Sequence, residues 1–300
     1  MFRPTRRDDH WDHQIARAES DHALFHILAN HVFPLEILIG AEVAQLRTFA
    51  IPSIARLLHA TRQYEDHGQR RVDDTRAILT EIGDHGTHTA EGQEMVRHLN
   101  AIHSHYRISN DDFLATLAAL VIDPMRTAAR LGWRAPTAAE KEAVYRMWQE
   151  VGHQMHIADL PADYEALVAW RAAYEAEVMR YTPANEAVTR GLLAAVAAQL
   201  PRPLRPLATP IIAWLVDDDA VLAALGLTPP RPWLGWMLET AAAVRRRMGR
   251  AVDWWRHQRF WDTHLFRDLP SYPEGYDRRR LGPPELIARM ARDQSPAATS

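Results

Sequence analysis

Apolar residues recur at every third or fourth position along most of this chain, and hardly any segment alternates between apolar and polar residues. A repeat near 3.6 residues predicts amphipathic α-helices, whereas a repeat of two would predict strands. We therefore predict an all-α protein that folds as a single large helical domain. The predicted helices span residues 14–32, 35–50, 68–82, 90–106, 109–124, 137–156, 162–181, 184–199, 233–248 and 250–265.

Local signals mark where several of these helices begin and end. Thr137 and Glu140 form a capping-box pattern at the start of one helix. Ser109 begins the preceding helix, and we expect Pro124 to end it because proline lacks the amide hydrogen. The prolines between residues 200 and 232 leave room only for short helices and turns. We predict a polar N-terminal arm over residues 1–13, one domain over 14–290 and a disordered tail over 291–300.

Composition narrows the classes of function. The chain has 300 residues, a formal charge of −3 and no cysteine. The weak negative charge argues against a nucleic-acid partner, which would need a concentrated basic surface. Without cysteine, a metal has to be held by His, Asp or Glu, and the chain has 16 histidines. Because the N-terminus lacks a signal-peptide pattern and no apolar window reaches the length of a transmembrane helix, we expect a cytoplasmic protein.

The predicted helix over 68–82 carries a charged residue on the face that should be buried. At about 100° per residue, Arg71 and Thr75 share one stripe with Ile78 and Ile82. Charges are seldom buried without a partner. Arg71 can extend its charged end to solvent or pair with a carboxylate of the core. Alternatively, it binds an anionic ligand in bidentate geometry, such as a haem propionate.

The predicted helix over 90–106 turns one histidine toward the interior. His103 lies at the edge of the apolar stripe and one turn after Asn100, whereas His105 falls on the opposite, solvated flank. An inward imidazole can be a core histidine that a backbone carbonyl satisfies, or a proximal haem ligand. Periodicity alone leaves both interpretations open.

A second metal hypothesis rests on two Glu-x-x-His pairs. Glu19 and His22 form one pair, and Glu150 and His153 form the other. Di-iron helical bundles use this motif twice, together with two further glutamates. Because glutamate and histidine are frequent here, a match to so short a motif carries little weight.

The segment from Trp233 to Trp261 mixes tryptophan with arginine. Such a helix can lie on a membrane surface with its rings at the level of the headgroups, so a peripheral membrane contact stays open. We favour the alternative that the tryptophans pack on the body of the protein while the arginines face water.

Several short motifs occur together, in order, between about residue 20 and residue 285. They are Phe33-Pro34, Ile51-Pro52-Ser53-Ile54-Ala55, Arg71-x-x-Asp74-Thr75, Asn100-x-Ile102-His103, Ile108-x-Asn110-Asp111-Asp112-Phe113-Leu114, Gly132-Trp133-Arg134, Glu150-Val151-Gly152, Tyr174-Glu175, Tyr272-Pro273-x-Gly275-Tyr276 and Gly282-Pro283. Each motif alone is short, but their order and spacing are specific. By this combination the chain resembles the MpaB and rubber-oxygenase (latex-clearing protein) family.

This resemblance implies an all-helical fold with a globin-like core and a bound haem b. Characterised relatives use O₂ to cleave a carbon–carbon double bond in an isoprenoid chain. By the resemblance, His103 is the proximal iron ligand, Arg71 and Thr75 line the haem pocket as the catalytic candidates, and Asn100 belongs to the cofactor-binding motif. Latex-clearing members carry a lysine beside the threonine that can reach the iron, and this chain has Asp74 there.

We therefore expect a haem b-dependent oxygenase that acts with O₂ on a lipophilic substrate of the isoprenoid class. The alternatives are a haem-binding sensor or peroxidase-like protein, which would share the His103 pocket, and a di-iron helical protein, which would not bind haem. Asp74 in place of the lysine makes a lysine-ligated iron unexpected and argues against long polyisoprene as the substrate.

Overall fold

The computed structural model describes residues 7–251 and 269–294, and every regular element in these ranges is a helix. The helices are α1 (Arg7–Ala16), α2 (Asp21–Ile27), η1 (Leu28–Val32), α3 (Pro34–Phe49), α4 (Pro52–Thr61), α5 (Gln63–His85), α6 (Ala90–His103), α7 (Asn110–Leu131), α8 (Ala138–Gln154), α9 (Tyr164–Val178), α10 (Pro183–Gln199), η2 (Arg202–Leu207), α11 (Ala208–Val216), α12 (Asp219–Leu225), α13 (Pro232–Ala251), η5 (Arg278–Arg280) and α15 (Pro284–Gln294). The prediction of one all-α domain is confirmed, while the globin-like character of its core stays a prediction.

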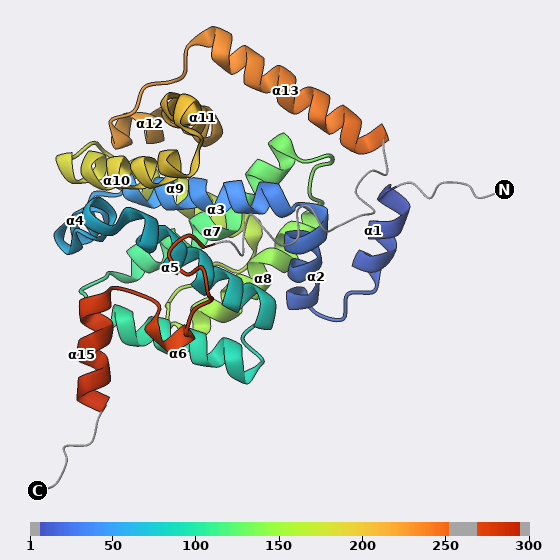
Figure 1. Ribbon diagram of the computed structural model, residues 1–300. Helices are drawn as coiled ribbons and strands as arrows, with labels where there is room; N and C mark the ends of the chain where they lie inside the picture. Colours follow the sequence, from blue (N-terminus) through green and yellow to red (C-terminus); the bar gives the residue numbers. More distant parts are fainter. Residues whose placement is uncertain (1–6, 252–268, 295–300) are drawn as a thin grey trace, which may run out of the picture.

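Helix α3 lies in the middle of the molecule, between two groups of helices (Figure 1). On one side, α2, α5, α7 and α8 bury a core that includes Tyr145. On the other side, α4, α10, α11 and α12 bury a core that includes Leu192. Because α3 contributes Ile37 to the first core and Val43 to the second, it joins the two groups into one domain.

Helix α7 does not end at Pro124, as we had predicted, but continues to Leu131. The reason is its packing against α3. A Cβ atom built on Gly40 of α3 would lie only 2.3 Å from the Cα atom of Pro124, so the two backbones are in direct contact there. Pro124 is buried in this contact, and the packing compensates for the hydrogen bond that proline cannot make within its helix.

The predicted helix over 14–32 is divided in the structure. Helix α1 begins at Arg7, within the predicted polar arm, and ends at Ala16. Ser20 then starts α2, because its side chain accepts a hydrogen bond from the amide of Ala23, and the last turn widens into the π-helix η1. In the described ranges no single helix is long and apolar enough to cross a membrane, and only α2–η1 with α3, a pair bent by 105°, pass that test together.

Three further predictions concern the start of α8, the proline-rich segment and the C-terminus. The capping box of Thr137 and Glu140 is confirmed at the start of α8, and residues 200–232 hold only the short helices η2, α11 and α12. Helix α15 continues to Gln294, so residues 291–294 are helical where we had predicted a disordered tail. The rest of that tail and nearly all of the helix predicted over 250–265 lie outside the described residues.

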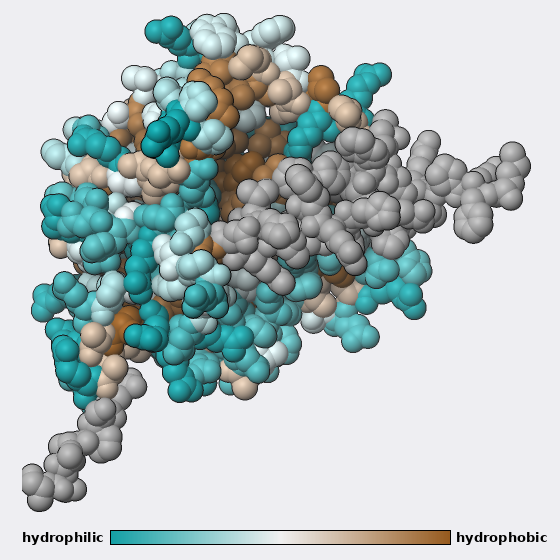
Figure 2. Space-filling model, viewed as in Figure 1, coloured by the Kyte–Doolittle hydropathy of each residue, from teal (hydrophilic) through white to brown (hydrophobic). Residues whose placement is uncertain are grey.

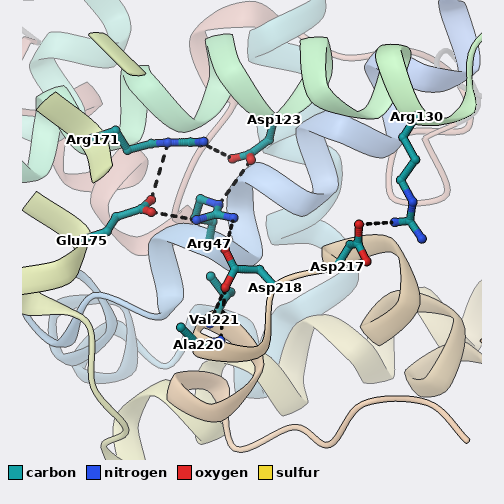
Figure 3. Close-up of polar contacts among 9 residues, drawn as sticks. All are labelled: Arg47, Asp123, Arg130, Arg171, Glu175, Asp217, Asp218, Ala220 and Val221. Carbon is teal, nitrogen blue, oxygen red and sulfur yellow. Dashed lines mark hydrogen bonds and ion pairs between the residues drawn. The ribbon is translucent and has the colours of Figure 1, made fainter. Parts of the chain in front are cut away.

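A buried ion network joins four helices (Figure 3). Arg47 of α3, 3% exposed, pairs with Asp123 of α7 at 3.2 Å, Glu175 of α9 at 2.7 Å and Asp218 before α12 at 2.9 Å. Arg171 pairs with Asp123 at 3.0 Å and with Glu175 at 3.8 Å. Burial alone would lower the pKa of Arg47. The three carboxylates together have a larger, opposite effect, so its pKa lies above the ordinary value. Arg47 therefore stays charged inside the fold.

Helix α13 is oriented opposite to our favoured interpretation. Its tryptophans face outward, with Trp233 58% and Trp236 72% exposed. Two of its arginines contact the body instead, since Arg245 donates to Glu36 at 2.6 Å and Arg246 donates to the carbonyl of Arg130. Figure 2 shows apolar residues exposed in the upper part of the molecule, where Figure 1 places α13. Trp254, Trp255 and Trp261 lie outside the described residues.

The contact between Gly40 and Pro124 predicts a large cost for one added methyl group. Gly40→Ala should lower the free energy of unfolding by about 1–3 kcal/mol or more, because α3 and α7 must move apart. Gly235→Ala is the matched control, since nothing lies within 4 Å of a Cβ atom at this position in α13. Urea unfolding should show Gly235→Ala unchanged or more stable by up to about 1 kcal/mol. Equal stabilities of the two variants would contradict the close contact.

Candidate functional site

Helix α5 presents Arg71 and Thr75 to each other, one turn apart. A guanidinium nitrogen of Arg71, Nη1, donates to the hydroxyl of Thr75, and that hydroxyl donates to the carbonyl of Arg71 at 3.0 Å. The guanidinium carbon lies 5.3 Å from the centroid of the Tyr64 ring. In the described part of the chain, no carboxylate lies within ion-pair distance of Arg71. The guanidinium is therefore held in place without a close ion pair, although its charge lowers the pKa of the buried Asp74.

His103 ends α6 with its ring turned toward the protein. The ring meets that of Phe113 edge to face, with 5.2 Å between the centroids. Its Nδ1 atom is buried and has no hydrogen-bond partner. A core histidine whose Nδ1 is satisfied by a backbone carbonyl is therefore not what the structure contains. His105, by contrast, is exposed, and its Nδ1 lies 2.8 Å from the carbonyl of Ala101.

The environment of His103 keeps its imidazole neutral. Burial disfavours the charged form, and the positive charge of Arg71 disfavours it further, so the pKa of His103 falls from 6.5 to about 4. At neutral pH the ring therefore keeps a lone pair, as a metal ligand must. This coupling also shows that the fold brings the end of α6 close to Arg71, although the two residues lie on different helices.

Asn100 joins α6 to another helix. Its Nδ2 donates to the carbonyl of Gln154, at the end of α8, at 2.8 Å. This bond fixes the position of the turn of α6 that precedes His103. A contact between Asn100 and a cofactor stays a prediction.

Asp74, at the position where the resemblance implies a lysine in latex-clearing proteins, connects the C-terminal segment to α5. It is 2% exposed and accepts a hydrogen bond from the hydroxyl of Tyr272. Burial raises the pKa of Asp74, and the hydrogen bond from Tyr272 opposes this effect only in part. Asp73 accepts from the amide of Ser271 at 2.9 Å, and Glu81 accepts from the hydroxyl of Tyr276 at 2.8 Å. The acidic side chains of α5 thus bind the segment that contains Tyr272 and Tyr276.

Sequence reasoning missed a hydrogen-bonded group that joins three of the motifs. Asp112, adjacent to Phe113, accepts a hydrogen bond from Ser53 at 2.7 Å and another from the hydroxyl of Tyr174 at 3.1 Å. Each of the three residues belongs to a different motif of the resemblance. The motifs were visible in the sequence, but the pairing of residues about 60 positions apart was not.

The di-iron hypothesis finds no support in the geometry. Glu150 and His153 are exposed on α8, and the Nε2 atom of His22 lies 2.9 Å from the carbonyl of Gly83. Within residues 7–251 and 269–294, no three His, Asp or Glu side chains converge in a way that could hold a metal ion. A di-iron centre would need such a convergence of carboxylates and imidazoles.

Comparison with known proteins assigns the family. The family model described as "ER-bound oxygenase mpaB/B'/Rubber oxygenase, catalytic domain" matches residues 35–266. This chain therefore belongs to the family of ER-bound oxygenase mpaB/B' and rubber-oxygenase catalytic domains. The matched range includes Arg71, Thr75 and His103, and the resemblance read from the motifs is confirmed.

Three fungal relatives have similar sequences. The ER-bound oxygenase mpaB' of Penicillium brevicompactum is 26% identical over 224 residues, which cover 69% of this chain and 53% of the relative. The ER-bound oxygenase mpaB of Penicillium roqueforti is 24% identical over 62% of this chain and 68% of the relative. The mpaB of P. brevicompactum is 27% identical over 53% of this chain and 45% of the relative. The chain thus spans about half the length of the two P. brevicompactum relatives.

The lowered pKa of His103 predicts a loss of stability in acid. Between pH 6.5 and about pH 4, the unfolded chain binds a proton on His103 that the folded protein does not. The free energy of unfolding therefore falls as the pH drops through this window. His103→Gln removes this contribution, so urea unfolding of the variant should depend less steeply on pH. His105→Gln should keep the wild-type slope, and equal slopes for all three proteins would contradict the burial of His103.

Proposed function

We propose that this protein is a haem b-dependent oxygenase that acts with O₂ on a lipophilic substrate of the isoprenoid class. The observation that carries the proposal is that the charge of Arg71 lies close enough to His103 to lower the pKa of its imidazole. The imidazole is neutral and its Nδ1 has no partner, while the guanidinium beside it pairs with no carboxylate of the described chain. Together they provide a ligand for a metal and a partner for an anion, and haem b needs both.

Each residue would have a distinct task. His103 would supply a nitrogen ligand to the iron, and Arg71 would bind a propionate. Thr75 would hold the guanidinium of Arg71 in position, as it does in the structure. The rings of Tyr64 and Phe113, which contact Arg71 and His103, would keep water from the site. Haem b, when bound, supplies the binding and activation of O₂.

The substrate class and the reaction rest on the family. Its described catalytic domain is that of an oxygenase, and the resemblance to rubber oxygenases suggests oxidative cleavage of a carbon–carbon double bond. A haem-binding sensor or peroxidase-like protein is the second candidate, because the same His103 pocket would serve it. Consumption of O₂ with formation of a product distinguishes the two candidates.

We further propose that the protein is cytoplasmic and makes a peripheral contact with a membrane, from which a lipophilic substrate would enter. Two findings support this. The outward face of α13 exposes Trp233, Trp236, Met237, Val244 and Met248, and the relatives are named ER-bound. Tryptophan and basic residues on one amphipathic helix are typical of binding at a membrane interface.

Haem binding should depend on His103 and Arg71. His103→Ala should abolish the axial ligation seen in the Soret band, whereas His105→Ala should leave that band unchanged. Arg71→Ala should weaken haem binding by about tenfold or more, since a charge-assisted hydrogen bond contributes about 1.5–3 kcal/mol. Haem titration followed by absorbance measures both effects. If only the His105 variant lost the band, the assignment of the ligand would be wrong.

Oxygen uptake by the reduced, haem-loaded protein should be measured next, with terpenoids and unsaturated lipids as substrates. Carbonyl products identified by mass spectrometry would support the oxygenase. A protein that binds O₂ reversibly and forms no oxidised product with any substrate of this panel would instead favour the sensor.

Membrane contact through α13 predicts a loss of vesicle binding when the tryptophans are removed. The double variant Trp233→Ala/Trp236→Ala should reduce binding to vesicles of anionic phospholipid by about tenfold or more, because both rings would leave the interface. Tyr181→Ala, which removes an exposed aromatic ring elsewhere, is the control. Co-sedimentation with the vesicles measures the effect, and equal losses for both variants would contradict a specific role of α13.

A further inference from the structure

A half-open pocket of about 110 Å³ lies on the side of α5 away from Arg71. Arg76, Leu79 and Gly83 line it, whereas Arg71 and His103 do not. At about 100° per residue, Arg76 and Gly83 point roughly 120–140° away from Arg71 around the helix. The pocket is therefore separate from the His103 site, and a ligand bound in it would be independent of the proposed haem chemistry.

The wall of this pocket is mostly apolar. It is formed where α2, α3, α5, α7 and α8 meet, and its buried side chains include Phe25, Leu38, Val144 and Trp148. An alkyl chain that enters the pocket would remove apolar surface of these side chains from water, which is favourable in proportion to the area. The wall therefore favours a ligand with an aliphatic part.

A carboxylate without a close cationic partner lies toward the mouth of the pocket. The side chain of Asp84 is 31% exposed, which is more than Glu42 and Arg76, the other two charged residues of the lining. In the described part of the chain, no lysine or arginine pairs with Asp84, and its Oδ1 atom lies 3.8 Å from the Nε2 atom of His26. That separation is too long for a hydrogen bond. The carboxylate of Asp84 is therefore open to a further donor.

Asn30 adds a second acceptor on the same side of the pocket. Its amide nitrogen, Nδ2, donates to the backbone carbonyl of His26 at 3.1 Å, so its amide oxygen is left to accept a hydrogen bond. Because Asn30 and Asp84 both lie next to His26, they belong to one side of the lining. This side offers two acceptor groups and one negative charge.

The other two charges of the lining cancel each other. Arg76 contacts the Oε1 atom of Glu42 through both Nε and Nη2, each at 2.7 Å. With this pair neutral as a whole, Asp84 gives the pocket a net negative charge. A carboxylate ligand would meet a charge of its own sign at the mouth, whereas a cationic ligand would meet an opposite one.

We propose that the pocket binds a primary alkylammonium ion. Its alkyl chain would contact Leu38 and Trp148, and its ammonium group would stay at the mouth and donate to Asp84 and Asn30. An ammonium has three donors and no acceptor, so it matches this side of the lining. Because the pocket is half open, the charged group keeps part of its hydration, as lysine does when it buries only its stem. Since an engineered cavity of about 150 Å³ binds benzene, a chain of about six carbons suits this volume.

Hexylamine can test the proposal in a ligand-observed NMR titration of the purified protein at about pH 8, where an alkylamine is protonated and a histidine of ordinary pKa is neutral. The neutral analogue 1-hexanol has a chain of the same length, and hexanoate carries the opposite charge. Hexylamine should bind about fivefold more tightly than 1-hexanol, as a partly exposed ion pair allows, and hexanoate should bind most weakly. Added NaCl should reduce the preference for hexylamine. Equal binding of hexylamine and 1-hexanol would overturn the proposal, and so would tighter binding of hexanoate.

Matched variants separate the charge of Asp84 from the shape of the pocket. Asp84→Asn should weaken hexylamine binding about fivefold, to the level of 1-hexanol. Its binding of 1-hexanol should stay unchanged, which also shows that the pocket is still folded. Asp219→Asn, at an exposed position on α12 outside the lining, should keep the full preference. Ala41→Leu, which places a larger side chain in the pocket, should weaken the binding of both ligands.

Two results with these variants would overturn the proposal. A preference for hexylamine that persists in Asp84→Asn would place the ammonium elsewhere, as would be the case if the amine bound to a haem iron. Unchanged binding of both ligands to Ala41→Leu would show that neither occupies the pocket.

Discussion

The guanidinium of Arg47 is the contact on which the arrangement of the helices depends. It pairs with carboxylates from α7, α9 and the start of α12, and thereby connects α3 to three helices that are distant in the sequence (Figure 3). Removing one partner from such a buried group leaves uncompensated charge, which costs about 3–5 kcal/mol. The partners must therefore stay together. The close backbone contact of Gly40 with Pro124 lies on the same helix pair as the Arg47–Asp123 pair, so electrostatics and packing place α7 against α3 at the same interface.

Helix α5 makes three separate sets of contacts, each through a different face. One face holds Arg71 and Thr75 near His103. Another holds Arg76, which pairs with Glu42 of α3 at 2.7 Å. The acidic residues between them bind the C-terminal segment through Tyr272 and Tyr276. All of these residues lie in the part of α5 that follows the kink at His67, so one uninterrupted stretch of helix positions them.

Part of the candidate site was predictable from helical periodicity. The spacing of Arg71 and Thr75 placed them on one stripe, and the position of His103 at the edge of an apolar stripe distinguished it from the exposed His105. The sequence did not predict the contacts that complete the surroundings. Asp74 meets Tyr272 across 198 positions, and no local pattern specifies a partner at that distance. The residue that departs from the family motif therefore has a structural partner that only the fold reveals.

The sequence by itself determined the fold class, most of the helices and the helix starts that depend on local caps. The capping box of Thr137 and Glu140 is an example, because its hydrogen bonds connect neighbours in the chain. The tertiary structure alone decided two other features. Helix α7 continues through Pro124 because α3 packs against it. Helix α13 turns its tryptophans outward because Arg245 binds Glu36, 209 positions away in the sequence. Periodicity shows that a helix has two faces, but which face is buried depends on the partners that the rest of the fold presents.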